Sequence, residues 1–285
     1  MATDRAGVFL QPGEIRELAD SLGVVPSKSR GQNFVVDANT VRKIVAQAGL
    51  TTGQTVVEVG PGLGSLTVAL LNAGHPVHAI EIDSRMAKAL ESTVTRKLPG
   101  APLEVVCADA MKVLSLPEKA TAVVANLPYN VAVPILIHFL TIQPNLARVL
   151  VMVQAEVGWR LAARPGSEHY GAPSVKVAWW GEWALEGSIS RSVFWPKPRV
   201  DSVLVGMRHR RPPGEEQLRH KVFQLVDEGF RTRRKMARQS LAALFGGAAE
   251  ASKALSKVGI DPESRCETWS LADFVAVAQG ERQER

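Results

Sequence analysis

Four consecutive residues, Asn126-Leu127-Pro128-Tyr129, combine groups that could activate an amine for alkylation. They follow the apolar run 121–125, which is typical of a buried strand, so we expect them where that strand ends. The exocyclic amine of a nucleobase is a poor nucleophile because its lone pair is delocalised into the ring. The Asn126 side-chain oxygen and the Pro128 carbonyl can accept its N–H groups, and Tyr129 can stack on an unstacked base. The motif indicates methyl transfer to such an amine, with a polar turn as the alternative.

A glycine-rich loop precedes this motif in the chain. Residues 58–65 read Glu-Val-Gly-Pro-Gly-Leu-Gly-Ser, between a strand-like run at 55–57 and a helix-like stretch that begins at Ser65. Glycines let the backbone approach a ligand closely, and a helix N-terminus offers free N–H groups. The dinucleotide fingerprint requires glycine at its sixth position, where this chain has Ser65. The loop therefore indicates cofactor binding but disfavours a nicotinamide dehydrogenase.

Acidic residues follow the next two strand-like runs. Glu81 lies about twenty residues after the glycine loop, where a carboxylate can bind both ribose hydroxyls of a nucleoside. Asp109 follows the run 103–107 and is suited to an adenine amino group. Glycine loop, ribose acid, adenine acid and target-amine motif in this order predict an S-adenosylmethionine site followed by a target-amine site. Helix N-capping by Glu81 and Asp109 is the alternative.

Apolar runs alternate with amphipathic stretches between Thr55 and Glu156. We expect strands at 55–59, 76–82, 103–107, 121–125, 148–153 and 203–207, and helices at 65–73, 84–97 and 134–142. This alternation predicts an α/β fold with a mostly parallel sheet covered by helices on both faces. Ligands of such sheets bind beyond the carboxyl ends of the strands, so the glycine loop, Glu81, Asp109 and Asn126 should converge on one rim.

Pro212-Pro213-Gly214 marks a domain boundary and predicts one domain over residues 1–211 and a smaller one over 212–285. Beyond the boundary the pattern is helical. One apolar stripe at helical spacing is formed by Phe223, Val226, Phe230, Ala237 and Leu241. The preceding segment 194–202 contains Pro196 and Pro198, which predicts a loop with Phe194 or Trp195 exposed near the rim. Core packing is expected for Trp179, Trp180 and Trp183.

The net charge of the chain is concentrated in one stretch. Between 206 and 238 there are ten Lys or Arg and four acidic residues, an excess equal to the net charge of +6 of the whole chain. The spacing predicts one helical face that carries Arg231, Arg234, Lys235 and Arg238. Such a basic ridge suits contact with the phosphates of RNA, and a solvated helix face is the alternative.

Composition restricts the class of protein. With 285 residues and 46% hydrophobic content the chain can form a large core. Cys107 and Cys266 lie far apart and the six histidines do not cluster, so neither a disulfide framework nor a metal site is expected. The N-terminus lacks the apolar run of a signal peptide, and no apolar stretch approaches membrane-spanning length. We expect a cytoplasmic protein with no membrane partner.

Together these motifs resemble the small-subunit ribosomal RNA adenine N6,N6-dimethyltransferase family, whose loss gives kasugamycin resistance. The resemblance runs from about Lys28 to Leu241. Besides the motifs above it is carried by Gly31-Gln32-Asn33-Phe34, Gln154-Ala155-Glu156-Val157, Tyr170-Gly171, the segment 194–202 and Phe230-Arg231-Thr232-Arg233-Arg234-Lys235. It implies a Rossmann-like class I methyltransferase domain with a mostly parallel seven-stranded sheet, and a small helical C-terminal domain that binds rRNA.

The resemblance also implies a reaction and a partner. The reaction is S-adenosylmethionine-dependent N6,N6-dimethylation of two adjacent adenosines near the 3′ end of small-subunit (16S) rRNA during ribosome biogenesis. The implied substrate form is a precursor ribosomal particle, and the implied enzyme is a monomer.

Roles are implied residue by residue. Cofactor binding is implied for Gln32, Asn33, Val35, Glu58, Gly60, Gly62, Gly64, Glu81, Ile82, Asp109, Ala110 and Asn126. The target base would meet Asn126, the Pro128 carbonyl, Tyr129 and Phe194. RNA contact is predicted for Lys28, Arg30, Lys197, Arg231, Arg233, Arg234, Lys235 and Arg238. No metal ligand is implied.

Two stretches depart from the family pattern. After Asn130 the family usually shows Ile-Ser-Thr-Pro, whereas this chain has Val131-Ala132-Val133-Pro134 and so lacks hydroxyls close to the target-amine motif. After Lys235 the family usually shows Thr-Leu-Arg-Asn, whereas this chain has Met236-Ala237-Arg238-Gln239. Both bear on substrate positioning, and neither removes a proposed catalytic group.

Three alternative functions remain open from the residues. Macrolide-resistance methyltransferases modify one adenosine of large-subunit rRNA but tend to carry Asn-Ile-Pro-Tyr and a Lys in the glycine loop, where this chain has Leu127 and Leu63. A DNA adenine methyltransferase would use the same amine chemistry, but the C-terminal basic segment is similar to that of the rRNA family. Intact Glu81, Asp109 and Asn126 argue against a non-catalytic ribosome assembly factor.

Overall fold

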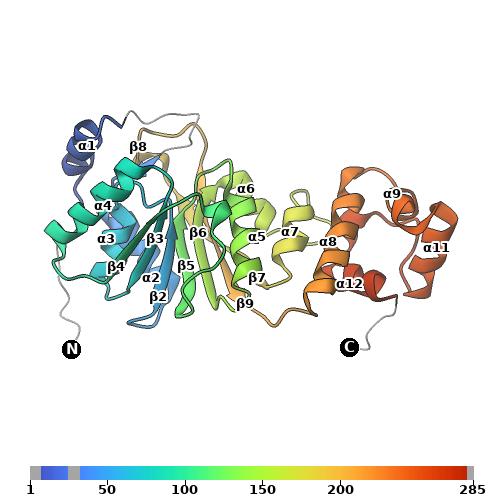
Figure 1. Cartoon of the computed structure of the whole chain (residues 1–285). Coiled ribbons are helices and arrows are strands. Elements are labelled where there is room, and N and C mark those ends of the chain that lie inside the picture. The colour runs from blue at the N-terminus through green and yellow to red at the C-terminus, as the bar shows by residue number, and fades with distance from the viewer. Residues whose placement is uncertain (1–7, 25–32, 281–285) are drawn as a thin grey trace. The chain divides into compact units, whose positions relative to one another are not determined.

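The computed structural model describes residues 8–24 and 33–280, and Figure 1 shows the course of the chain. Contacts divide the chain into two compact units. The first comprises Met1–Gly158 with Ala184–His209, and the second comprises Trp159–Trp183 with Arg210–Arg285. Each unit is therefore built from two separate stretches of sequence.

A seven-stranded sheet forms the centre of the first unit (Figure 1). Its strands are β2 (Thr55–Val59), β3 (Val77–Glu81), β4 (Leu103–Cys107), β5 (Ala120–Asn126), β6 (Arg148–Gln154), β7 (Gly181–Ile189) and β9 (Ser202–His209). They lie in the order β4-β3-β2-β5-β6-β9-β7. Neighbouring strands from β4 to β6 pair in parallel, and β9 is antiparallel to β6. The prediction of an α/β fold with a mostly parallel sheet is confirmed.

Helices and short segments connect these strands. The helices of the first unit are α1 (Pro12–Ser21), α2 (Ala38–Ala48), α3 (Ser65–Asn72), α4 (Ser84–Lys97), α5 (Ala132–Ile142) and the start of α6 (Ala155–Leu161). Among the described residues of this unit, 3-10 turns are formed at η2 (Ala110–Lys112) and η3 (Arg191–Val193). A separate antiparallel pair is formed by β1 (Phe34–Val35) and β8 (Phe194–Trp195), with Val35 opposite Phe194.

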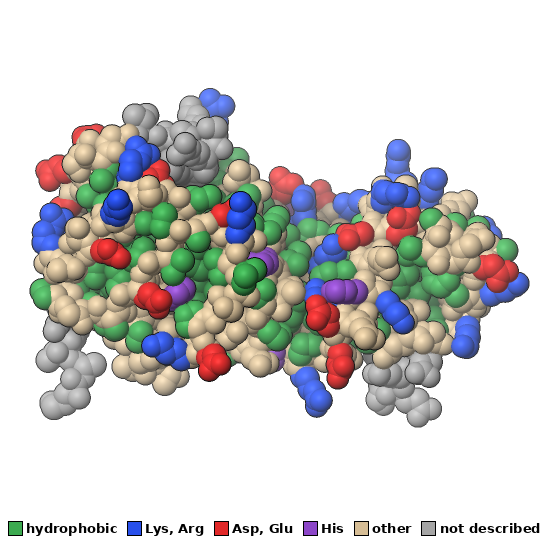
Figure 2. Space-filling model, in the orientation of Figure 1, with side chains coloured by type: hydrophobic (Ala, Val, Ile, Leu, Met, Phe, Trp, Pro, Cys, Tyr) green, Lys and Arg blue, Asp and Glu red, His purple; other side chains and the backbone are tan. Residues whose placement is uncertain are grey.

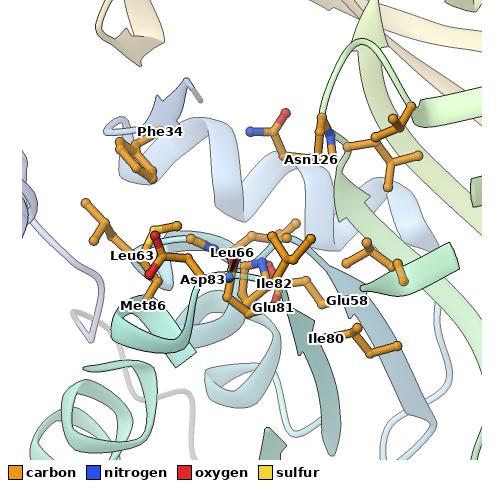
Figure 3. A pocket seen from close by; sticks show the side chains of 18 of the residues that line it. Phe34, Glu58, Leu63, Leu66, Ile80, Glu81, Ile82, Asp83, Met86 and Asn126 are labelled. Carbon is orange, nitrogen blue, oxygen red and sulfur yellow. Dashed lines mark hydrogen bonds between the residues drawn. The ribbon is translucent and has the colours of Figure 1, made fainter. Parts of the chain in front are cut away.

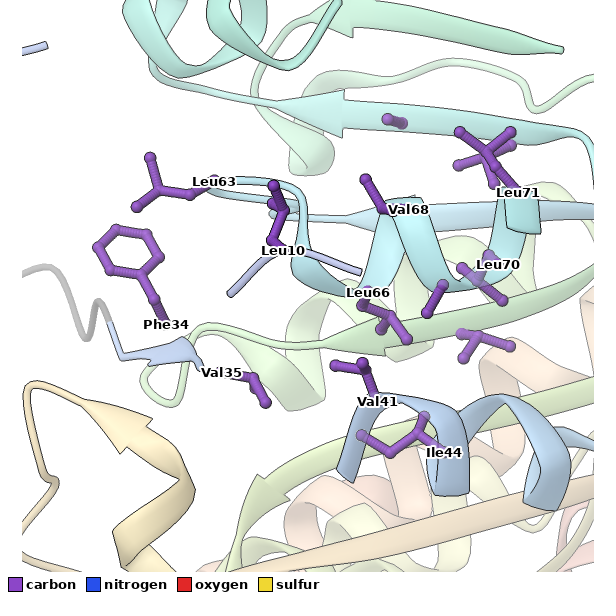
Figure 4. Close-up of a cluster of buried hydrophobic side chains, with 14 of the residues drawn as sticks. Leu10, Phe34, Val35, Val41, Ile44, Leu63, Leu66, Val68, Leu70 and Leu71 are labelled. Atoms are coloured by element: carbon purple, nitrogen blue, oxygen red, sulfur yellow. The ribbon is translucent and has the colours of Figure 1, made fainter. Parts of the chain in front are cut away.

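The central strands are mostly buried. Every residue of β2 and β3 is buried, as expected for parallel strands covered on both faces, and β5 and β6 are half-buried only near their ends. The edge strand β4 has only exposed and half-buried positions. Figure 4 shows side chains of α2 and α3, including Val41 and Leu66, packed in one buried cluster. This packing fixes the sheet and therefore the rim at which its strands end.

Local signals at the strand ends determine where the following helices begin. The Asp37 carboxylate accepts a hydrogen bond from the Thr40 backbone N–H and caps α2, and Asp83 caps α4 through the Arg85 N–H. Gly64, with a φ of +91°, begins α3 with no side-chain cap. Helix α3 thus presents backbone N–H groups directly after β2.

The second unit is helical. It contains α7 (Ala172–Val177), α8 (Glu216–Arg231), α9 (Ala237–Ser240), α10 (Ala242–Phe245), α11 (Ala248–Lys257), η4 (Cys266–Thr268) and α12 (Leu271–Gln279). Aromatic side chains form its core: the Trp180 ring meets Phe223 edge-on at 5.8 Å, and Phe230 stacks on Phe274 at 6.2 Å. The predicted burial of Trp179 and Trp180 is confirmed, since they are 2% and 1% exposed.

The division into units corrects the domain boundary. The sequence predicts residues 1–211 as one domain, but residues 159–183 belong to the second unit. The physical reason is their long-range packing on α8: Lys176 pairs with Asp227 at 2.6 Å, and Tyr170 meets the Phe230 ring at 5.9 Å. The chain passes from the first unit to the second for the last time between His209 and Arg210, and Pro212-Pro213-Gly214 follows shortly after this point.

The expectation of one helix through residue 241 is wrong. Helix α8 ends at Arg231, because Thr232 leaves helical geometry with φ −130° and ψ 66°. A turn follows, closed by a hydrogen bond from Lys235 N–H to the Thr232 carbonyl, and α9 begins at Ala237. Arg231, Arg233, Arg234 and Lys235 therefore form an exposed cationic turn rather than one face of a helix. We call these four residues the basic turn.

Candidate active site

The carboxyl ends of β2, β3 and β5 open on a cavity of about 780 Å³ in the first unit (Figure 3). Its lining includes twelve of the residues predicted from the sequence: Asn33, Val35, Glu58, Gly60, Gly62, Glu81, Ile82, Asp109, Ala110, Asn126, Pro128 and Tyr129. The expected convergence of the glycine loop, the two acids and the target-amine motif on one rim is confirmed. The cavity can hold a ligand larger than a single amino acid or base.

The glycine loop lies against the cavity with a left-handed backbone that residues with a side chain rarely adopt. Gly62 has a φ of +57°, and a Cβ added there would lie 2.9 Å from Phe34 Cε1. Gly60 has a φ of +64° and lies beside Pro128. Gly64 is not among the lining residues and instead begins α3, where an added Cβ would lie 2.6 Å from Leu90 Cδ1.

Glu81 ends β3 and is only 3% exposed. Its Oε2 accepts a hydrogen bond from the Gly62 N–H at 3.1 Å, and its Oε1 accepts one from the Asp83 N–H at 3.0 Å. Each oxygen keeps a lone pair for a ligand hydroxyl. Burial raises the pKa of Glu81 against the lowering effect of these hydrogen bonds. Helix capping by Glu81 does not occur, because Asp83 caps α4.

Glu58 lies within β2 behind the glycine loop and is 1% exposed. The Thr67 hydroxyl donates a hydrogen bond to its Oε2 at 2.7 Å. Burial raises the pKa of Glu58 to about 8, and the negative charge of Glu81 adds to this effect. Two buried carboxyls thus face the cavity, and within the described residues neither pairs with a Lys or Arg. A positively charged ligand beside these carboxyls would favour their ionised forms and so lower both pKa values.

Asp109 follows β4 and lies at another part of the cavity wall. Its Oδ1 accepts a hydrogen bond from the Met111 N–H at 2.9 Å, so the capping alternative is realised for the 3-10 turn η2. The second carboxylate oxygen keeps its acceptor capacity for a ligand. Ile82 lines the same cavity and is 69% exposed, which offers apolar surface to a flat ring.

Asn126 is the last residue of β5, and Figure 3 shows it apart from Glu81, Ile82 and Asp83. Its Nδ2 donates a hydrogen bond to the Asn33 carbonyl at 3.1 Å, which orients the amide. Its Oδ1 is buried and has no hydrogen-bond partner within the described residues. A buried acceptor without a donor costs free energy unless a ligand supplies one. The amide is therefore arranged to accept an N–H.

The remaining groups of the motif lie next to Asn126. The Pro128 carbonyl accepts a hydrogen bond from the Val131 N–H at 3.2 Å and keeps a second lone pair. The Tyr129 hydroxyl bonds the Ser202 hydroxyl at 2.7 Å, which ties the motif to the start of β9. Burial raises the pKa of Tyr129, so the phenol stays neutral.

Other predicted residues lie elsewhere. Phe194 pairs through β8 with β1 and is 4% exposed, and Trp195 is half-buried, so the expected exposure of either ring is not found. The Trp195 ring packs on the Phe34 ring at 6.3 Å, and Phe194 belongs to the buried cluster that also contains Phe34 and Val35. Phe194 is not among the residues that line the cavity. Gln32, Lys28 and Arg30 lie outside the described residues, and Lys197 lies in the loop after β8.

Sequence reasoning missed Thr67, Ser202 and Phe34 as parts of the site. Phe34 and Ser202 lie within motifs that carry the family resemblance, and Thr67 follows the glycine loop, nine positions after its partner Glu58. The Tyr129 and Ser202 hydroxyls are 73 positions apart. A small polar residue at the start of a strand that ends beside the motif is the only signal that could have indicated Ser202.

The predicted RNA-contact residues of the second unit have partners of different kinds. Arg231 pairs with Glu228 at 2.5 Å, Arg233 lies 3.4 Å from Glu267, and Arg238 pairs with Glu263 at 3.1 Å. Within the described residues, Arg234 and Lys235 form no ion pair. Figure 2 shows Lys and Arg side chains gathered along one edge of the helical unit.

Neither a metal site nor a membrane span is found in the part of the chain that the structure describes. No group of three or more His, Cys, Asp or Glu side chains in it is placed to hold a metal ion. None of its helices is both long and apolar enough to cross a membrane.

Comparison with known proteins identifies close relatives. The sequence profile of a family described as "Ribosomal RNA adenine dimethylase" matches residues 26–280. The chain is 56% identical over 273 residues to the ribosomal RNA small subunit methyltransferase A of Leifsonia xyli subsp. xyli, with 95% of this chain and 98% of the relative covered. It is 51% identical to the protein of the same name from Thermobifida fusca, with 95% and 96% covered.

Solved structures share the fold. A dimethyladenosine transferase from Plasmodium falciparum has a TM-score of 0.71 at 23% identity, over 85% of this chain and 94% of its own. The 23S rRNA methyltransferase ErmE has a TM-score of 0.66 at 24% identity, over 87% and 99%. These likenesses confirm the class I methyltransferase fold and carry no more than the fold. The family profile and the relatives together cover nearly the whole chain, and the chain is a member of the ribosomal RNA adenine dimethylase family.

Proposed function

We propose that this chain dimethylates the N6 amines of two adjacent adenosines near the 3′ end of small-subunit rRNA, with S-adenosylmethionine as the methyl donor. One observation carries the proposal. Asn126 Oδ1 is buried, has no hydrogen-bond partner within the described residues, and belongs to a residue that lines the same cavity as the glycine loop and Glu81. Because Asn126 lies apart from Glu81, Ile82 and Asp83 in this cavity (Figure 3), its oxygen suits an amine that approaches a cofactor bound at those residues. The names of the relatives favour the small-subunit over the large-subunit rRNA.

The residues present fit this cofactor. When bound, S-adenosylmethionine supplies a methyl group on a positively charged sulfur. Glu81 would hold the ribose hydroxyls, Asp109 the adenine amine, and the backbone at Gly60 and Gly62 the methionine end. The fit rests on two features of the cavity. The Glu81 carboxylate keeps acceptor capacity for two ribose hydroxyls, and the backbone of Gly60 and Gly62, with positive φ, lines the cavity without side chains.

The target-amine residues act by alignment and by charge. The amine nitrogen becomes cationic as its bond to the methyl carbon forms, so its N–H groups become stronger donors. Hydrogen bonds to Asn126 Oδ1 and the Pro128 carbonyl therefore strengthen in the transition state, which is what accelerates the step. The Tyr129 ring stacks on the adenine, and its hydroxyl is held by Ser202. No side chain has to be a strong base, since the proton can leave to water afterwards.

The second transfer uses the same groups in a different pairing. After the first methylation the amine has one N–H left, so only one of the two acceptors can bind a donor. The other must then tolerate a methyl group beside it. Ala132 and Val133 replace the Ser and Thr that the family usually carries, and Val131 lines the cavity, so this chain offers apolar contact from Val131 near that methyl group.

The proposed substrate is a precursor ribosomal particle in the cytoplasm, bound by a monomer. Support comes from the basic turn, whose Arg234 and Lys235 have no acidic partner within the described residues and can bind phosphates. The remainder of the chain has balanced charge, so contact with the polyanion is expected at this turn rather than over the whole surface.

The test is incubation with radiolabelled S-adenosylmethionine and small subunits from cells that lack this methylation, followed by digestion of the RNA. The expected product is N6,N6-dimethyladenosine near the 3′ end of the small-subunit rRNA. Label in large-subunit rRNA instead would favour the macrolide-resistance activity. Tight binding to the particle with no label in either RNA would favour a non-catalytic assembly factor. Gel filtration of the protein alone and with the particle tests the monomer.

A further inference from the structure

Two aromatic side chains lie together on the surface of the second unit and have no part in the proposed reaction. The rings of Trp159 and His169 have centroids 5.2 Å apart and planes 31° from parallel, and both side chains are exposed. Trp159 is 42% exposed, whereas Trp179 and Trp180 are 2% and 1% exposed. A single exposed apolar residue needs no explanation. Two exposed aromatic rings in contact at this tilt offer π surface of the kind to which a nucleobase binds.

The basic turn lies beside this aromatic pair. Arg233 Nη2 donates hydrogen bonds to the carbonyl of Tyr170 at 2.8 Å and to that of Glu168 at 3.5 Å, so it binds on both sides of His169. The loop that carries His169 is further held by a hydrogen bond from Gly166 N–H to the Glu267 carbonyl at 2.8 Å. The aromatic pair is thus fixed to the same part of the unit as the cations of the turn.

The charges around the pair are suited to a polyanion. Arg164 is exposed in the loop between α6 and α7, and Arg234 and Lys235 form no ion pair within the described residues. An exposed aromatic surface with neighbouring cations is the combination by which proteins bind single-stranded nucleic acid: the rings stack on bases and the cations bind the intervening phosphates. A paired base in a helix offers no free face, so the ligand must contain an unpaired nucleotide.

We infer that Trp159 and His169 form a stacking site for an unpaired base of the RNA substrate, separate from the site of the methylated adenine, with the basic turn on the adjoining phosphates. The inference rests on the proposed function, because it assigns part of the same RNA to a second contact. Its consequence is that the second unit contributes base stacking as well as charge to substrate binding.

The first experiment compares Trp159→Ala, Trp159→Phe and the matched control Leu244→Ala in binding to small subunits that lack the methylation. Leu244 is 41% exposed in the same unit and lies outside the pair. We expect Trp159→Ala to weaken binding by about tenfold, which is the effect of losing one base–aromatic stack. Trp159→Phe should retain most of the affinity, and Leu244→Ala should retain all of it. The salt dependence should be unchanged in all three, because no charge is removed.

The second experiment uses the unaltered protein and so does not depend on how the variants fold. Small subunits containing 4-thiouridine are irradiated with the protein, and crosslinked peptides are identified by mass spectrometry. RNA attached to the peptide with Trp159 or His169 is expected. Binding of Trp159→Ala equal to that of the unaltered protein, or no RNA crosslink to this loop, would overturn the inference.

Two outcomes separate this inference from the proposed function. If the unaltered protein neither binds nor methylates small subunits, the proposed function itself fails. If it methylates them and Trp159→Ala does so with equal affinity, only the stacking site fails.

Discussion

The side chain on which most of the proposed chemistry depends is Asn126. Its amide is oriented by one hydrogen bond to the backbone of Asn33, and its other end has no partner within the described residues. An amide that is bonded at both ends would have to break a bond in order to receive a substrate. The one-sided bonding of Asn126 is therefore a form of pre-organisation, in which the acceptor is already in place before the amine arrives.

Replacement of Asn126 by alanine should remove this acceptor. We expect Asn126→Ala to lower the turnover number about 100-fold or more, by analogy with the loss of one group that binds developing charge. Cofactor affinity, measured by calorimetry, should change little because Glu81 and the glycine loop are intact. The control is Asn145→Ala, an exposed asparagine on the loop before β6. Near-normal turnover of Asn126→Ala would refute the role.

Glu58 should give the protein a pH-dependent stability. Burial raises its pKa from 4.5 to about 8 in the folded chain, so between these values the folded state binds more protons than the unfolded state. The stabilising contribution is complete below about pH 4.5 and is lost as the pH rises through about 8. We expect Glu58→Gln to remove this fall in the free energy of unfolding, which is on the order of a few kcal/mol.

Urea unfolding of the unaltered protein and of Glu58→Gln over this pH range measures the difference. Glu118→Gln, at an exposed position, should keep the slope of the unaltered protein. Parallel curves for Glu58→Gln and the unaltered protein would show that Glu58 has an ordinary pKa in the folded chain.

Among the elements, the join between β2 and α3 leaves little room for a side chain at Gly64. Gly64 begins α3 with a φ of +91°, and a Cβ added there would lie 2.6 Å from Leu90 Cδ1 in α4. Gly53 also has a positive φ, of +82°, but an added Cβ would meet nothing within 4 Å. A substitution at Gly53 would therefore cause backbone strain alone, whereas one at Gly64 would cause backbone strain and steric overlap.

Substitution of these two glycines by alanine tests this difference. Both should lose about 1 kcal/mol through left-handed backbone strain. Gly64→Ala should lose about 1–3 kcal/mol more, because Leu90 has to move within a packed core. Denaturant unfolding of both variants gives the comparison. Equal losses in the free energy of unfolding would mean that Leu90 in α4 can move aside without cost. The start of α3 would then not be fixed by packing against α4.

At the scale of the whole molecule, the excess of positive charge lies in one short stretch while the rest of the chain is balanced. Neutralising Arg231, Arg234 and Lys235 together should therefore weaken binding to small-subunit rRNA and lower the slope of log affinity against log salt by about two to three. The control neutralises Lys43, Lys253 and Lys257, which are equally exposed but lie elsewhere. An unchanged slope in the first variant would mean that the basic turn is a solvated charged surface that does not contact phosphates.

Much of the first unit could be predicted from the sequence because its strands are continuous apolar runs. The bounds predicted for β2, β4 and α4 coincide with the observed Thr55–Val59, Leu103–Cys107 and Ser84–Lys97. The two-residue strands β1 and β8 could not be predicted, since two residues are too few to show a period. The convergence of Glu81 and Asn126 was predictable because parallel strands end at one edge.

Features that depend on distant contacts could not be predicted in this way. The end of α8 at Arg231 goes against a helical pattern that continues to Leu241, and the turn is tied to α9 by a hydrogen bond between the Thr232 and Ser240 hydroxyls at 3.0 Å. The grouping of residues 159–183 with the second unit depends on aromatic contacts such as Trp180 with Phe223. The hydroxyl pair of Tyr129 and Ser202 likewise joins segments that carry no mutual signal in the sequence.

The order of strands in the sheet also fixes the distance between Glu81 and Asn126. Glu81 ends β3 and Asn126 ends β5, with β2 between them, so the two groups are separated by two strand spacings, or about 10 Å. Side-chain substitution cannot alter this interval, because it is set by backbone hydrogen bonds across the sheet. A descendant of this chain that modified a different acceptor would therefore keep β2, β3 and β4 as they are. It would change only the segments after β5 and before β9. Recognition of the molecule that supplies the methyl group and recognition of the molecule that receives it can therefore diverge independently.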